Sequence, residues 1–259
     1  MGLITISASN VATVPSYWSG TERVPGNEAW TTIRAGAGTG TDTPTVSYSC
    51  SAGANLWYVL RRVDAVFDLT PYTNLKTVTA AQLRFEVDDV NSAVAGFAGN
   101  NTYNGVLLTT QNESLRSNVN NTASNHAAVR AGSPVSSLPW TSVNTTGFKT
   151  MGFNATGVSY LNPIMTKPLY KGYAMFGMQY YGEYVNVVPT WYSGVAGLPA
   201  IRVRRPAYLD LTMVDSDIQI NVGNSWKQSY IMPQINIGNV WRPATGMKIN
   251  IGNVWRTIK

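Results

Sequence analysis

The segment Val78-Thr-Ala-Ala-Gln-Leu-Arg-Phe-Glu-Val87 decides the fold class. Leu83, Phe85 and Val87 alternate with polar side chains, and this period of two is the pattern of a half-buried β-strand. A longer segment rich in β-branched and aromatic residues, 56–69, precedes it. Because such side chains suit a pleated surface, both segments predict β-structure.

We expect further strands at residues 3–7, 30–34, 45–49, 106–110, 172–184 and 201–214. Residues 15–29 and 185–199 hold prolines and glycines and are expected to be loops, and residues 111–139 are expected to form a long surface excursion. Residues 151–161 fit either an extended strand or a short helix. About eight to ten strands with little helix signal predict an all-β fold. The expected architecture is a jelly-roll or β-sandwich domain over 1–214, followed by an array of short β-hairpin repeats over 215–259.

Composition limits the function classes. Charged residues make up 12% of the chain and the formal net charge is +6, but the cations are scattered, so we expect no nucleic-acid binding. The single cysteine, Cys50, excludes an intrachain disulfide, and the single histidine, His126, is expected to be solvated in a polar loop. The sequence shows no signal peptide and no apolar stretch of about 18 residues, so we expect no membrane span and synthesis in the cytosol.

One motif occurs three times near the C-terminus: Ile220-Asn-Val-Gly-Asn-Ser-Trp-Lys227, Ile235-Asn-Ile-Gly-Asn-Val-Trp-Arg242 and Ile249-Asn-Ile-Gly-Asn-Val-Trp-Arg256. Its tryptophans are 15 and then 14 residues apart, which is too short for a helical solenoid repeat. Gly-Asn between alternating segments is a signal for a two-residue hairpin turn. Each motif therefore predicts one β-hairpin.

Two registers are open for these hairpins. A two-residue turn pairs Asn236 with Trp241, so that the tryptophan shares a face with asparagine. A three-residue turn with a bulge pairs Ile237 with Trp241 and places both on the face of Ile235. We favour the second register because it makes one continuous apolar face.

An isolated hairpin is at best marginally stable in water, whereas a covered tryptophan buries up to about 250 Å². The repeats are therefore predicted to dock on a partner; the alternative is an appendage folded back on the first domain. The residues predicted to dock are Ile220, Val222, Trp226, Ile235, Ile237, Trp241, Ile249, Ile251 and Trp255.

The large domain resembles the jelly-roll modules of bacterial surface and carbohydrate-associated proteins called DNRLRE-type. The resemblance covers roughly residues 30–214 and rests on Arg62, on Val66-Phe-Asp-Leu-Thr70, on 78–85 and on Arg205-Pro-Ala-Tyr-Leu-Asp-Leu211. It implies a jelly-roll fold and a role in adhesion or carbohydrate association.

The repeats are similar to the C-terminal ends of virion structural proteins from tailed phages, especially phages of Bacteroidetes hosts. This resemblance implies a non-enzymatic head- or tail-associated virion protein, assembled in the host cytoplasm. Other virion proteins are the expected partners. A homo-oligomer is also expected, with a trimer as the candidate because fibre proteins are often trimers.

The alternative function is a carbohydrate-binding adhesion module that recognises a host-surface glycan. Trp191 and Tyr192 are its candidate residues because exposed aromatic rings can stack on sugars. We expect no catalytic residues, no cofactor and no metal, since no Gly-x-Ser-x-Gly motif is present and Asp88-Asp89 lacks the spacing of a calcium loop.

Overall fold

The chain divides into two compact units, Met1–Val214 and Asp215–Lys259, and each is treated by itself. A computed structural model describes residues 2–8, 17–24, 28–41, 44–50, 57–72, 76–91, 105–111, 122–166, 172–187 and 200–214 of the first unit. In the second unit it describes the backbone of residues 215, 218–222, 225–229, 234–237, 240–243, 247–251 and 254–258.

The first unit is built mainly from antiparallel strands, which confirms the predicted all-β class. Its strands are β1 (Gly2–Ala8), β2 (Tyr17–Arg23), β3 (Thr39–Thr41), β4 (Thr45–Cys50), β5 (Trp57–Asp68), β6 (Lys76–Asn91), β7 (Gly105–Thr110), β8 (Pro134–Pro139), β9 (Gly147–Gly152), β10 (Tyr173–Tyr180) and β11 (Ala200–Asp215). Its helices are α1 (Trp30–Ala35), α2 (Thr122–Ala131), α3 (Trp140–Val143), α4 (Ala155–Thr166) and α5 (Tyr181–Tyr184), with a 3-10 turn at Thr70–Tyr72.

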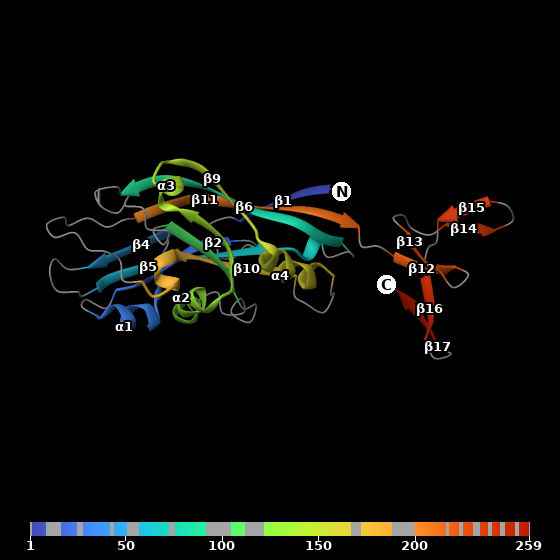
Figure 1. Cartoon of the computed structure of the whole chain (residues 1–259), viewed down its shortest axis with the longest axis horizontal. Coiled ribbons are helices and arrows are strands. Elements are labelled where there is room, and N and C mark those ends of the chain that lie inside the picture. Colours follow the sequence, from blue (N-terminus) through green and yellow to red (C-terminus); the bar gives the residue numbers. More distant parts are fainter. Residues whose placement is uncertain are drawn as a thin grey trace. The chain divides into compact units, whose positions relative to one another are not determined.

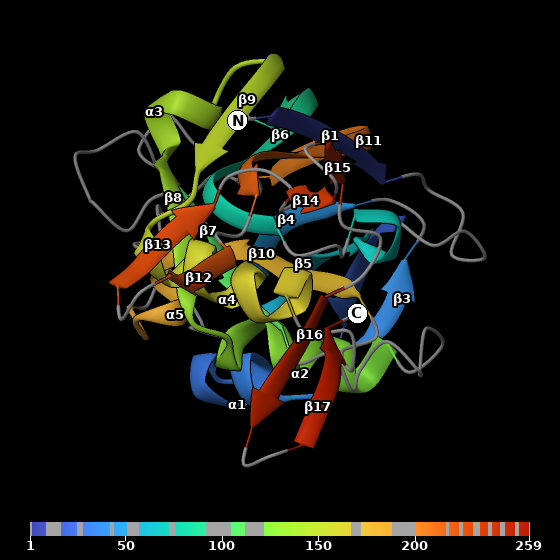
Figure 2. The same ribbon diagram turned by 90° about the vertical axis from the view of Figure 1, so that its right-hand side faces the viewer.

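The strands form one hydrogen-bonded system in the order β8-β7-β10-β5-β4-β11-β6-β9. β1 adds to β11, and β2 adds to β5 and carries β3. β4 connects two parts of this system, because Ser47 pairs both with Arg61 of β5 and with Ala200 of β11. Figures 1 and 2 show that these parts form two layers, with β9, β6, β11 and β1 in one and β7, β10, β5 and β2 in the other.

The hydrophobic core lies between the two layers. Leu83, Phe85 and Val87 of β6 are each 0% exposed, whereas the residues between them are half-buried, which confirms the predicted alternation. Phe67 of β5 and Phe176 of β10 face them from the other layer as members of the same apolar cluster. Burial of these side chains is the main favourable term in the stability of the unit.

β5 and β10 are buried along nearly their whole length, as expected for a strand between layers. Their second face is covered by α2, which contacts β2, β5 and β10, and by α1, which contacts β5 (Figure 1). The first unit thus carries helices on the outer side of one of its strand layers.

Three expectations about local structure are wrong. Residues 30–34 are helical rather than extended, because Trp30, Ile33 and Arg34 recur at helical spacing and are all buried. Residues 15–29 include β2, and residues 111–139 include α2 and β8 rather than a surface excursion. His126 and Val129, three residues apart on α2, are both 0% exposed, so this polar segment has a buried side.

Both alternatives left open for residues 151–161 occur in succession. β9 ends at Gly152, and α4 begins at Ala155 with Asn154 as its cap, whose Oδ1 accepts a hydrogen bond of 3.0 Å from the backbone N–H of Gly157. Tyr160 of this helix stacks edge-on against Phe176, with ring centroids 5.6 Å apart. α4 therefore packs on the core side of β10.

The second unit contains three two-stranded antiparallel sheets: β12 (Ile218–Val222) with β13 (Ser225–Ser229), β14 (Gln234–Ile237) with β15 (Val240–Pro243), and β16 (Met247–Ile251) with β17 (Val254–Ile258). Asn236 pairs with Trp241 and Ile237 with Val240, which is the register of a two-residue turn. The favoured register is therefore wrong, because Asn236 rather than Ile237 pairs with Trp241.

Replacement of Phe85 by alanine tests where the core lies. Because Phe85 is fully buried between the layers, we expect the free energy of unfolding to fall by about 3–5 kcal/mol. The exposed Thr150 of β9, which pairs with Arg84 in the neighbouring strand, provides the control, and Thr150→Ala should change stability by less than about 1 kcal/mol. Chemical denaturation measures both, and a similar effect of the two variants would contradict this core.

Candidate functional site

Charged residues occupy the face of β5 that lies opposite the core. Arg62 and Asp64 alternate with Val63 and Ala65, and successive side chains of a strand point to opposite faces. Arg62 is 0% exposed and Asp64 is 1% exposed. Because an unpaired buried charge is strongly destabilising, the groups that surround these two side chains decide the local structure.

The Arg62 guanidinium binds three separate segments of the chain. Its Nε donates a 2.7 Å hydrogen bond to Glu183 Oε1 in α5, and its Nη2 donates to the same oxygen. Nη2 also donates to the carbonyl oxygen of Arg34 at 2.8 Å, and Nη1 donates to the carbonyl oxygen of His126. One buried cation thus connects β5 with α1, α2 and α5.

The last turn of α2 is held by polar groups of the sheet. The carbonyl oxygen of Val129 accepts hydrogen bonds from Thr109 Oγ1 at 2.7 Å and from Gln179 Nε2 at 2.9 Å. Carbonyls in the last turn of a helix have no partner within the helix, so these two donors satisfy one of them. Gly177 permits this approach, since a Cβ atom there would lie 2.6 Å from the methyl carbons of Val129.

Asp64 lies in a region where hydrogen-bond acceptors outnumber the available donors. Gln111 Nε2 donates to Asp64 Oδ1 at 2.5 Å. Buried acceptors without a hydrogen-bond partner among the described atoms include Asp64 Oδ2, Gln111 Oε1, Gln179 Oε1 and Glu183 Oε2. Burial raises the pKa of the Asp64 carboxyl to about 6, against the lowering effects of the Gln111 hydrogen bond and of Arg62. A proton on Asp64 supplies this cluster with a donor.

His126 is buried in α2, which corrects the expectation of a solvated loop histidine. Its Nδ1 lies 3.1 Å from Thr21 Oγ1, and that hydroxyl donates to the Arg62 carbonyl oxygen at 3.5 Å, so Nδ1 is the donor to Thr21. The ring packs on Gly38, where a Cβ atom would lie 2.5 Å from His126 Cγ. Burial, with Arg62 and Arg23 nearby, lowers the pKa of His126 to about 2.

Arg62, Asp64, His126 and Glu183 together form what we call the buried charge cluster. A buried carboxyl with a raised pKa beside a histidine suits proton transfer. Each of the four side chains is at most 1% exposed, however, so none reaches a substrate at the surface in this conformation. The arrangement supports a structural role, in which the cluster orients the covering helices.

Asp88 and Asp89 are the acidic pair considered for calcium. Arg202 Nε donates to Asp88 Oδ1 at 2.9 Å, and Arg202 Nη1 lies 3.7 Å from Asp89 Oδ2. An arginine thus occupies the position in which a cation would bind these carboxylates. Within the described residues, no group of three histidine, cysteine or acidic side chains is placed to hold a metal ion.

The remaining predicted site residues are placed only in part. Trp191 and Tyr192 lie outside the described residues, as does the Cys50 side chain. For the predicted docking residues the structure gives the backbone pairing: Asn221 with Trp226, Asn236 with Trp241 and Asn250 with Trp255. All three two-stranded sheets therefore share one register.

Comparison of the chain with known protein families and with curated proteins gives no match. In the part of the chain that the structure describes, no helix is long and apolar enough to cross a membrane. Geometry and sequence are therefore the grounds on which a function is proposed.

The buried charge cluster was missed at the sequence level. One signal was present: Arg62 and Asp64 interrupt an otherwise apolar strand, which is unusual for a strand that is buried on both faces. The partners His126 and Glu183 are 64 and 121 residues away from Arg62, so no local pattern connects them.

Removal of one partner of the buried pair tests the structural role. Glu183→Gln leaves the Arg62 charge uncompensated at 0% exposure, so we expect the free energy of unfolding to fall by about 3–5 kcal/mol. The double variant Arg62→Met/Glu183→Gln removes both charges and should recover part of that loss. Urea denaturation measures the cycle; additive losses in the double variant would show that the two side chains are independent.

The pH dependence of stability tests the protonation states. Between about pH 4 and pH 6 the folded chain holds a proton on Asp64 that the unfolded chain lacks, and the unfolded chain holds one on His126 that the folded chain lacks. Because Asp64 and His126 change the free energy of unfolding with pH in opposite directions, their contributions cancel in the native protein. In Asp64→Asn only the His126 term is left, so stability should fall by up to about 1.4 kcal/mol per pH unit below pH 6.5.

At pH 7 the ionised Asp64 carboxylate destabilises the fold, so Asp64→Asn should raise the free energy of unfolding by about 1–3 kcal/mol. Gln111 can rotate its amide to accept from the new side chain, because its Oε1 has no partner among the described atoms. Thermal unfolding followed from pH 4 to pH 8 distinguishes the variants. Parallel curves for the native protein and Asp64→Asn would refute the assignment.

Proposed function

We propose that this protein is a non-enzymatic structural protein of a tailed-phage virion, and that residues 215–259 dock it to other virion proteins. The observation that carries the proposal is that each described sheet of the second unit contains only two strands. Two-stranded sheets of four or five residues are marginally stable in water, and each has two open backbone edges. A partner that covers the hairpins would stabilise them.

The identical register of the three hairpins supports a repeated contact. In each hairpin the asparagine of the first strand pairs with the tryptophan of the second. Because the three motifs have nearly the same sequence and the same strand register, each hairpin would offer the same surface to a partner. Three copies on one chain would bind a partner with repeated sites far more tightly than one copy, since the second and third contacts are intramolecular.

The first unit serves in this proposal as the body of the protein, with the finer reading of its fold being a jelly roll. The Arg62 guanidinium of its buried charge cluster is bound by its own chain, and each of the four side chains is at most 1% exposed, which supports a non-enzymatic role. A homo-oligomer, with a trimer as the candidate, would bring several sets of hairpins together.

Deletion of residues 216–259 tests the docking role. We expect the shortened chain to fold, because the core described above lies within residues 1–214, and to be lost from assembled particles. Near-ultraviolet circular dichroism measures folding, and quantification of the chain in purified particles measures incorporation. Incorporation of the shortened chain at the full level would refute the proposal.

Two full-length variants separate the apolar contact from charge. Replacement of Trp226, Trp241 and Trp255 by alanine should abolish incorporation, because each ring would lose a large apolar contact area. The matched control replaces Lys227, Arg242 and Arg256 by glutamine and should incorporate normally. Strong protection of all three tryptophans from acrylamide quenching in a dilute monomer would support the folded-back alternative instead.

A further inference from the structure

Two guanidinium groups at the ends of neighbouring helices have no carboxylate of their own. Arg34 and Arg130 lie in the last turns of α1 and α2, and these helices contact each other. Within the described residues neither arginine forms an ion pair, because the nearby carboxylate of Glu183 is bound by Arg62. This region therefore holds three guanidinium groups, Arg34, Arg62 and Arg130, against the two carboxyl groups of Glu183 and Asp64.

Neutral groups surround Arg34 in place of a counter-ion. It is 7% exposed, donates from Nε to the Glu183 carbonyl oxygen at 2.8 Å, and packs 5.8 Å from the ring centroid of Trp30. Burial lowers the pKa of the Arg34 guanidinium; Glu183 opposes this shift, and Arg130 and Arg62 lower the pKa further. Arg130 is thus close enough to repel Arg34, and the region has an excess of positive charge.

Arg130 also presents an unused hydrogen-bond donor. Among the described atoms its buried Nε has no hydrogen-bond partner, although the side chain as a whole is half-buried. A buried donor without a partner is destabilising, and an oxyanion is the acceptor that forms the strongest hydrogen bonds with a guanidinium.

Asn186 adds a third donor at the same place. Its side-chain oxygen accepts a 2.5 Å hydrogen bond from Arg34 Nη1, which leaves its exposed amide nitrogen as a donor. Its backbone has φ of 61°, and among the described non-glycine residues it is the one with positive φ. Such a conformation is unfavourable for most residues and recurs at ligand sites.

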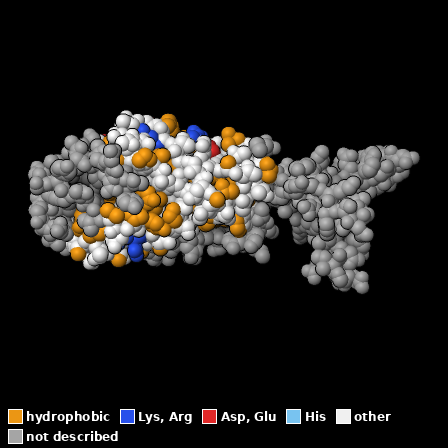
Figure 3. All heavy atoms as spheres, viewed as in Figure 1, with side chains coloured by type: hydrophobic (Ala, Val, Ile, Leu, Met, Phe, Trp, Pro, Cys, Tyr) orange, Lys and Arg blue, Asp and Glu red, His pale blue; other side chains and the backbone are white. Residues whose placement is uncertain are grey.

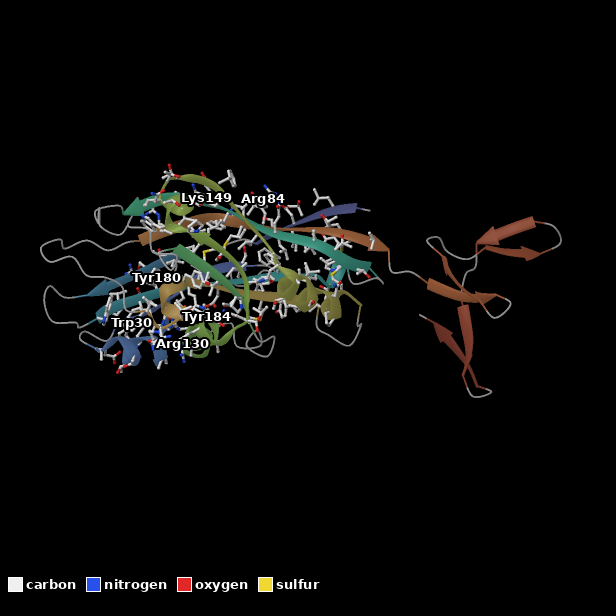
Figure 4. The ribbon with its side chains drawn as sticks, in the orientation of Figure 1. Trp30, Arg84, Arg130, Lys149, Tyr180 and Tyr184 are labelled. Atoms are coloured by element: carbon white, nitrogen blue, oxygen red, sulfur yellow. The ribbon has the colours of Figure 1, made fainter. Side chains whose placement is uncertain are left out.

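The surface around these groups suits an organic anion. Figure 3 shows hydrophobic side chains gathered over the region of α2 and α5, with a basic group at its lower edge, and Figure 4 labels Arg130, Tyr184 and Trp30 in this part of the unit. Tyr181, Tyr184 and Val185 are half-buried there. Aromatic and apolar surface beside a cation can pack on the ring of a sugar while the cation binds its acidic group.

We infer that Arg34, Arg130 and Asn186 form a binding site for an oxyanion group, carried by an acidic sugar or present as free phosphate. The two guanidinium groups supply the charge, and the amide of the exposed Asn186 supplies a directed donor. The buried Arg130 Nε–H would gain an acceptor if the half-buried Arg130 side chain turned toward the anion. The inference concerns the first unit and does not rest on docking by the hairpins.

Titration of the full-length chain with sodium glucuronate and with sodium phosphate tests the site, with glucose and sodium chloride as neutral and ionic-strength controls. The backbone and arginine Nε–H signals in NMR spectra report binding directly. We expect saturation at roughly millimolar concentration and a shift of the Arg130 Nε–H signal. Arg130→Gln should weaken binding by roughly tenfold or more.

Lys149→Gln is the matched control, because it removes the same charge from a lysine whose described contact is Thr145, and it should bind like the native protein. Asn186→Gly keeps a residue that tolerates positive φ, so it should fold normally and still bind more weakly. Tighter binding of glucuronate than of phosphate would identify an acidic sugar, and the reverse would identify phosphate. Absence of saturation, or equal affinity of Arg130→Gln and the native protein, would overturn the inference.

Discussion

The buried ion pair between Arg62 and Glu183 is the constraint on which the first unit depends. Both side chains are 0% exposed, and charges at that depth are tolerated only when partners surround them. The guanidinium meets this condition through the Glu183 carboxylate and through backbone carbonyls of Arg34 and His126. The position of β5 relative to α1, α2 and α5 is therefore set by one cation, and each of these helices is needed to keep it paired.

The two faces of the β5 layer are stabilised by different forces. The inner face packs Phe67 and Phe176 into an apolar core, where burial is the driving force and direction matters little. The outer face holds α2 by directed hydrogen bonds, since Val129 accepts from Thr109 and Gln179. Directed bonds specify the position of a helix more closely than apolar contact does, because a shift breaks them. In the same layer, the contributions of His126 and Asp64 to the pH dependence of stability have opposite signs.

The covering of Arg62 also assembles the inferred anion site. α1 and α2 come together over β5 because their carbonyls bind Arg62, and this brings Arg34 and Arg130 close to each other. The first unit thus combines a paired interior cation, Arg62, with two neighbouring guanidinium groups that form no ion pair within the described residues. The described strands of the second unit form three two-stranded sheets with one shared register. An anion would bind the first unit at one place, through charge and hydrogen bonds. The second unit would dock through three copies of the same apolar contact.

The alternation at Leu83, Phe85 and Val87 was sufficient to predict β6 from the sequence, since periodicity is a property of neighbouring residues. The sequence did not reveal β2 or β8, and it predicted a strand where α1 lies. It did not reveal α2, whose polar side chains show their buried face only once β5 and β10 lie beneath them. The register of β14 and β15 could have been predicted from local turn rules, but the prediction gave more weight to a continuous apolar face and was wrong. The buried charge cluster was decided by tertiary structure alone, because Arg62 and Glu183 are 121 residues apart and meet only when the layers and helices have assembled.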